Sequence, residues 1–154
     1  MSLTRSLSLA CTSQQRVVAT KKATKAVKKP QLAFNLHGQT VAVVIGKGLR
    51  EHEITKMIAS HHGHTLVVDA FYHQKDRYQH FNNELRTADI IIMVQNYMKH
   101  ATSKTITDVA SRNNKKFAIS KSGGLQSIEQ AIYRADQGIK AYENSSSSID
   151  YPTK

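Results

Sequence analysis

The stretch Val41-Ala-Val-Val-Ile-Gly-Lys-Gly-Leu-Arg50 decides the fold of this chain. Its first five residues are apolar and mostly β-branched, which is typical of a strand buried on both faces. The glycines at 46 and 48 then allow a tight turn, and a helical pattern begins at once. A strand, a glycine turn and a helix open a βα unit, which places backbone N–H groups at the carboxyl end of a central strand, where anions bind readily.

Similar units follow along the rest of the chain. Apolar runs predict strands at 41–45, 65–68, 90–94 and 117–119. Apolar residues at helical spacing predict helices at about 49–62, 76–88, 100–113 and 125–137, with Asp76 as an N-cap and Gly63 as a C-cap. Because crossovers between parallel strands are right-handed, we expect a three-layer, Rossmann-like α/β fold. Its four-stranded parallel sheet has the order 2-1-3-4 and helices on both faces.

The positive charge of the chain is concentrated near the N-terminus. The 154 residues carry a net charge of +11. Residues 1–37 hold no acidic residue, and their basic residues are Arg5, Arg16, Lys21, Lys22, Lys25, Lys28 and Lys29. We predict that residues 1–30 form a disordered basic arm, in which Arg16, Lys21, Lys22, Lys25, Lys28 and Lys29 bind nucleic acid. A solubilising tail and a transit peptide are the alternative interpretations.

Composition limits the remaining organisation. Residues 31–142 are predicted to form a single α/β domain, which opens with a short half-buried strand at 31–37, and residues 143–154 a disordered tail. No apolar run approaches the roughly 18–20 residues of a membrane span. The single cysteine, Cys11, excludes an internal disulfide and a cysteine-based metal cluster, which suits a reducing compartment. We expect a cytoplasmic protein.

Polar residues and glycines follow each predicted strand. Because the carboxyl ends of parallel strands lie at one edge of a sheet, these residues should meet there. The predicted ligand-binding residues are Gly46, Lys47, Gly48 and Arg50 after the first strand, Asp69 after the second, Asn96, Lys99 and His100 after the third, and Lys121, Ser122, Gly123 and Gly124 after the fourth. The last group is either an anion-binding nest at a helix N-terminus or a plain turn with Ser122 as a local cap.

More specific sites are disfavoured by the sequence. Gly46-x-Gly48 with Asp69 resembles part of a dinucleotide fingerprint, but Glu51 occupies the third glycine position and would repel a pyrophosphate, so no cofactor is expected. No Walker motif is present. The run His61-His-Gly-His64 lies at a helix end away from the ligand edge, and histidines near terminal carbonyls explain it better than a metal does. His100 could bind an anion or transfer a proton, but no nucleophile is paired with it.

Residues 41–142 resemble a small bacterial family known only as a domain of unknown function (DUF2325). The resemblance rests on the βα order and on short matches, namely Val-Ala-Val-Val-Ile-Gly46, Asp69, Ala88-Asp89, His100 and Lys121-Ser-x-Gly-Leu-x-Ser127. Family members often carry Thr-Asp-x-x-Ser-His after the third strand, where this chain has Asn96 in place of the Asp and Lys99 in place of the Ser. The resemblance implies the fold, a bacterial cytoplasmic origin and a site near His100, but no reaction.

Three hypotheses for function follow from these features. The first is a non-catalytic, regulatory binding protein that engages nucleic acid or a phosphorylated ligand through the basic arm and the strand-end anion pocket. The second is an enzyme acting on a phosphorylated small molecule, with His100 as acid/base. The third is an oligomeric scaffold module, in which residues 31–37 pair with a partner strand.

Overall fold

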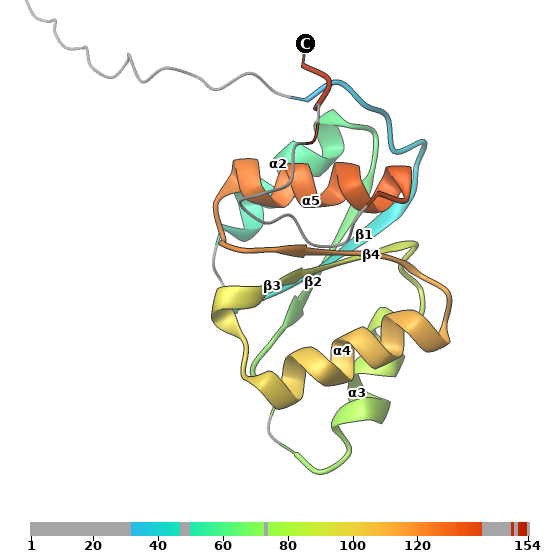
Figure 1. Ribbon diagram of the computed structural model, residues 1–154, viewed down its shortest axis with the longest axis vertical. Coiled ribbons are helices and arrows are strands. Elements are labelled where there is room, and N and C mark those ends of the chain that lie inside the picture. The colour runs from blue at the N-terminus through green and yellow to red at the C-terminus, as the bar shows by residue number, and fades with distance from the viewer. Residues whose placement is uncertain (1–31, 47–49, 73, 140–148, 150, 154) are drawn as a thin grey trace, which may run out of the picture. The chain divides into compact units, whose positions relative to one another are not determined.

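The computed structural model describes residues 32–46, 50–72, 74–139, 149 and 151–153. They contain a parallel sheet of four strands in the order β2-β1-β3-β4 (Figure 1). The strands are β1 (Thr40–Ile45), β2 (His64–Asp69), β3 (Ile90–Val94) and β4 (Lys116–Ser120). The predicted α/β class and strand order are therefore confirmed. The predicted basic arm lies outside the described residues.

Helices cover both faces of the sheet. In Figure 1, α2 (Glu51–Ser60) and α5 (Leu125–Gln137) lie on one face, and α3 (Arg77–Leu85) and α4 (His100–Arg112) lie on the other. Helices α4 and α5 match the predicted ranges within one residue, whereas α2 and α3 are shorter than predicted. Arg50 and His62 flank α2 and both have left-handed backbone angles, with φ of 51° and 63°, which ends the helical geometry on either side. None of the helices just named is both long and apolar enough to cross a membrane.

Strand β1 divides the core into two clusters. Val41, Val43 and Ile45 pack toward α2 and α5, while Ala42 and Val44 pack toward α3 and α4. All five side chains are buried, and so are those of the neighbouring strand β3. Burying one valine or isoleucine side chain stabilises a fold by about 1.5–3 kcal/mol. The unbroken apolar run of β1 is thus explained by burial on both faces.

Gly63 has a different role from the one predicted. The left-handed residue after α2 is His62, so Gly63 is not needed for its backbone angles. It is needed for packing instead, because a Cβ atom there would lie 2.6 Å from Leu36 Cδ1 and 2.9 Å from Ile58 Cγ2. The absence of a side chain lets residues 32–36 approach the end of α2.

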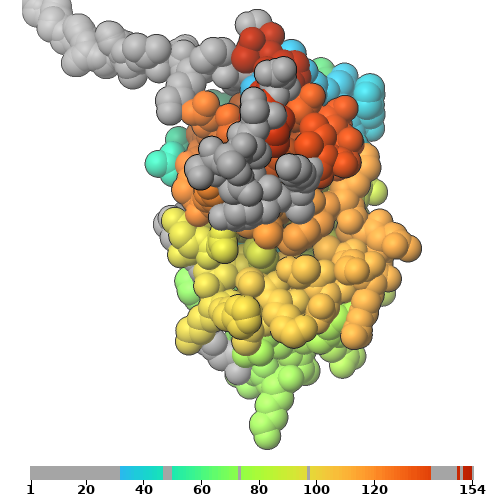
Figure 2. All heavy atoms as spheres, viewed as in Figure 1, coloured from blue at the N-terminus to red at the C-terminus, as the bar shows by residue number. Residues whose placement is uncertain are grey.

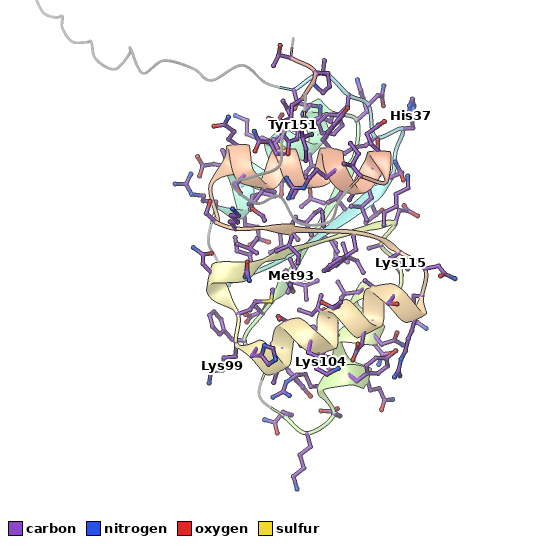
Figure 3. All side chains as sticks on the ribbon, in the orientation of Figure 1. His37, Met93, Lys99, Lys104, Lys115 and Tyr151 are labelled. Carbon is purple, nitrogen blue, oxygen red and sulfur yellow. The ribbon has the colours of Figure 1, made fainter. Side chains whose placement is uncertain are left out.

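The predicted strand at 31–37 is wrong. Leu32 forms only an isolated antiparallel bridge with Thr153, and the Ala33 N–H donates to the Pro152 carbonyl at 2.8 Å. The tail predicted to be disordered therefore includes a packed segment, 151–153, which Figure 2 shows against the residues after Leu32. Tyr151 packs its ring edgewise on Tyr133, with 5.6 Å between ring centroids (Figure 3).

A buried hydrogen bond between His61 and Glu129 joins the end of α2, α5 and the segment before β1. His61 Nε2 lies 2.6 Å from Glu129 Oε2, and both side chains are almost wholly buried. The other ring nitrogen, Nδ1, lies 3.0 Å from the Phe34 carbonyl oxygen, which can only accept, so Nδ1 carries hydrogen. The Phe34 ring stacks on the imidazole at 3.9 Å. His61 thus joins three separate parts of the chain.

Replacing Gly63 by Ala should destabilise the protein by about 1–3 kcal/mol, because the added methyl group overpacks the contact between Leu36 and Ile58. Urea unfolding followed by circular dichroism measures the change. Gly124→Ala is the matched control, since a Cβ atom there would only meet Ser122 Oγ at 3.5 Å, an ordinary contact. Equal stability of the two variants would contradict this account of Gly63.

Replacing Glu129 by Ala should cost about 3–5 kcal/mol, because it leaves the buried His61 ring without its partner. Glu129→Gln should cost much less, since an amide can donate to a neutral imidazole nitrogen. The same unfolding measurement applies. Asp108→Ala, which removes an exposed ion pair to Lys104, should change stability by about 0–1 kcal/mol. If Glu129→Ala destabilises the protein no more than Asp108→Ala does, the buried pair contributes no more to stability than an exposed ion pair.

Candidate functional site

The loops that follow the strands leave the sheet at one edge. Ile45 pairs with Asp69, and Val94 pairs with Ser120, so neighbouring strands end at the same level. The described residues of the predicted ligand site follow four different strands and therefore lie at this edge of the sheet. Lys47 and Gly48 lie outside the described residues. We call this set of loops the carboxyl edge.

At the opposite, amino edge, two acidic side chains accept hydrogen bonds from other parts of the chain. Asp89 accepts the Thr40 N–H at 2.9 Å, and Asp136 accepts hydrogen bonds from Gln39 and Lys116. These contacts tie strands and α5 together. At the carboxyl edge, in contrast, several polar side chains have no such partners.

Acidic residues surround the start of α2. Arg50 has φ 51°, and its guanidinium lies 3.7 Å from the Glu53 carboxylate. Glu51 and Glu53 both occupy the first turn of α2, where they complement the helix dipole. Arg50, Glu51, His52 and Glu53 line a shallow depression. The two carboxylates oppose an anion here, so Arg50 is the least suitable of the predicted anion ligands.

Asp69 has a local structural partner. Its Oδ1 accepts the backbone N–H of Phe71 at 2.9 Å, which forms a tight turn directly after β2. Asp69 is half-buried. Its carboxylate therefore fixes the path of the β2–α3 loop, a role that the sequence had not suggested.

The loop after β3 carries exposed polar side chains. A 3-10 turn, Gln95–Tyr97, follows the strand directly, and Lys99 then precedes the first residue of α4, His100. Asn96, Lys99 and His100 are exposed. Figure 3 shows Lys99 extending outward at the start of α4. Among the described residues none forms a hydrogen bond or ion pair with these three side chains, so His100 has no group that would orient it as a base.

The turn after β4 is held by serines. Ser120 Oγ donates to the Ser122 carbonyl at 2.7 Å and lies 2.7 Å from Ser127 Oγ. Ser122 Oγ accepts the Gly124 N–H at 3.3 Å. Gly124 has φ −67° and would accommodate a Cβ atom, so glycine is not required at this position. Ser122 thus holds the turn before α5, although no side chain caps the helix itself, and Lys121 is exposed beside it.

A cluster of rings after β2 was not predicted. Tyr72 stacks on His80, with 3.7 Å between ring centroids and 5° between ring planes. The Tyr72 hydroxyl donates to Asp76 Oδ1, so Asp76, the predicted N-cap of α3, contacts a side chain instead of a helix N–H. The mixture of aromatic and basic residues from 71 to 80 is the sequence signal that could have identified this loop.

The pKa of Tyr72 is raised above its ordinary value of 10.0. The main cause is the hydrogen bond to the Asp76 carboxylate, followed by desolvation and by the carboxylate's negative charge. Tyr72 thus remains a neutral donor at physiological pH.

No group of three or more metal-ligating side chains occurs among the described residues. His61, the first residue of the run from His61 to His64, already contacts the Glu129 carboxylate and the Phe34 carbonyl through its two ring nitrogens.

A model of the family of uncharacterised proteins conserved in bacteria (DUF2325) matches residues 40–135. The chain belongs to this family. Comparisons with curated proteins and with solved structures give no match.

The DUF2325 match begins at the first residue of β1 and ends within α5. It therefore includes the whole sheet and every loop of the carboxyl edge. The seven basic residues between positions 1 and 37 precede the matched region.

Asp76→Asn should lower the pKa of Tyr72 toward 10.0, because it removes the negative charge and weakens the hydrogen bond. Carbon NMR of the Tyr72 ring across an alkaline titration, assigned with Tyr72→Phe, measures the change. Asp108→Asn, on α4, should leave the titration unchanged. A Tyr72 pKa that is the same in the Asp76→Asn variant as in the unaltered chain would contradict the assigned cause.

Proposed function

We propose that this protein is a non-catalytic, regulatory binding protein that engages nucleic acid through its phosphates. The observation that supports this most directly is the charge at the helix starts of the carboxyl edge. Arg77 begins α3, Lys99 precedes α4, and Lys121 precedes α5. None of these helices has an acidic residue in its first turn, although Asp76, which accepts the Tyr72 hydroxyl, directly precedes α3. Cations near a helix N-terminus oppose the dipole, and a bound anion would relieve that conflict.

The charge of the whole chain favours a polymer as the ligand. Residues 1–37 add seven basic residues and no acid, in a chain whose net charge is +11. Such an excess attracts a polyanion over long distances and is more than one small phosphate needs. The side chains of Asn96, Lys99 and His100 are also exposed, which suits an extended ligand. We propose a cytoplasmic location for the protein, because bacterial nucleic acid lies there.

The two other hypotheses receive less support. An enzyme that uses His100 as acid/base would require a group to orient the ring, and none of the described residues does so. A scaffold that pairs residues 31–37 with a partner strand loses its basis, because Leu32 and Ala33 already pair with residues 152–153 of the same chain. Association of whole domains into a homo-oligomer is compatible with the proposal.

Binding should be strongly salt-dependent. With about five phosphate contacts, the slope of log K against log salt concentration should be near −4 to −5 on duplex DNA. Fluorescence anisotropy with a labelled duplex measures it. A full-length variant with the arm residues changed to Gln should give a flatter slope; these residues are Arg16, Lys21, Lys22, Lys25, Lys28 and Lys29. An unchanged slope would move the binding surface onto the α/β domain.

The carboxyl edge can be tested in the same assay. Lys121→Ala should weaken binding by about 1–3 kcal/mol, because it removes a charge-assisted contact to a phosphate. The control is His64→Ala, since His64 is exposed at the first residue of β2, on the amino edge. If the control weakens binding as much as Lys121→Ala does, the site has been placed at the wrong edge.

A further inference from the structure

An aromatic side chain is exposed at the carboxyl edge. Phe71, two residues after the end of β2, is 52% exposed, the largest exposed fraction among the large hydrophobic side chains of the described residues. The other one that is exposed is Ile139, at 39%, just after α5. A single exposed apolar side chain is common on protein surfaces, but this ring lies at the edge of the sheet where we propose that nucleic acid binds.

The backbone that carries Phe71 is held in place on both sides. Its own N–H donates to Asp69 Oδ1 at 2.9 Å. The next residue, Tyr72, is fixed by its stacking on His80, by its hydrogen bond to Asp76 and by an edgewise contact with Phe81, whose side chain is buried. An exposed ring on a fixed backbone loses little further freedom when it binds a ligand.

Cations accompany Phe71 on the same side of the sheet. Lys75 and Arg77 lie in the loop and first turn that follow it. Lys99 precedes α4, and α3 and α4 cover the same sheet face, where Tyr72 and Met98 pack against one cluster. The carboxylates of this region, Asp69 and Asp76, are bound to the Phe71 N–H and the Tyr72 hydroxyl. Lys75 and Arg77 therefore follow Phe71 closely along the chain, and Lys99 begins a neighbouring loop at the same edge of the sheet.

We propose that Phe71 is a stacking platform for a base of single-stranded nucleic acid, whose phosphates contact the cations around it. This inference rests on the proposed function and narrows its ligand. An exposed aromatic ring with cations in the same and the neighbouring loop matches a base and the phosphates of an unpaired strand. In a duplex the bases are already stacked on one another, so Phe71 would find no free base face. The family match includes Phe71, so the platform belongs to the matched α/β domain and not to the arm.

Anisotropy measurements on the full-length protein test the inference with three labelled probes. One is a thymidine oligonucleotide of about 20 nucleotides, longer than the roughly 4–16 nucleotides of typical single-strand sites. The second is an abasic strand of the same length and charge, and the third is a duplex. Phe71→Ala should weaken binding of the thymidine strand about 10-fold, because stacking contributes about 1–3 kcal/mol per base. Binding of the abasic strand and the duplex should change less than 2-fold, which is about 0.4 kcal/mol.

Matched variants separate stacking from other effects of the substitution. Phe71→Trp should retain the affinity for the thymidine strand, and Phe71→Leu should lose it, because leucine is apolar but has no π face. Ile139→Ala should have no effect on any probe. Thermal unfolding checks that Phe71→Ala folds, as expected for an exposed side chain.

The outcomes distinguish this inference from the proposed function. If Phe71→Ala weakens binding of the abasic and thymidine strands equally, or if Phe71→Leu binds as well as the unaltered chain, the stacking platform is overturned while nucleic-acid binding stands. If the unaltered protein binds none of the three probes at low salt, the proposed function itself fails.

Discussion

Burial of the central strands on both faces is the constraint on which the rest of this structure depends. Strand β1 alternates its side chains between two separate apolar clusters, and β3 does the same beside it. Neither face can be left to water, so helices must return over both sides of the sheet. With short connections and right-handed crossovers, that requirement produces the order β2-β1-β3-β4 and directs every strand the same way.

Parallel direction gives the two edges of the sheet different properties. At the amino edge, Asp89 and Asp136 hold strands and helix together through hydrogen bonds within the chain. At the carboxyl edge, helix N-termini converge with exposed Asn96, Lys99 and His100. The carboxyl edge thus combines polar groups that hold its loops, such as Asp69 and Ser120, with exposed side chains that have no partner among the described residues. The exposed group is the physical basis for proposing a phosphate-binding surface there.

The β2–α3 loop contains both polar groups that fix its own backbone and side chains that are exposed to a ligand. Asp69 and Asp76 are the acids nearest Phe71 in the chain, and both are used to fix the loop: one binds a backbone N–H and the other a tyrosine hydroxyl. Their charges therefore take part in local hydrogen bonds, while Lys75 remains exposed. A fixed aromatic ring beside cations suits unpaired nucleic acid better than a small phosphorylated metabolite, which would offer fewer bases to stack.

The sequence by itself determined the fold class, the strand order and the apolar helix faces, because the unbroken run from Val41 to Ile45 and the helical spacing of residues such as Ile128 and Ile132 follow directly from burial. Only the tertiary structure decided the roles of single polar and glycine residues. The buried partnership of His61 and Glu129, the packing need for Gly63 and the pairing of Leu32 with Thr153 join segments far apart in the chain. A local sequence pattern does not predict such contacts, because they depend on which surfaces meet after the sheet has formed.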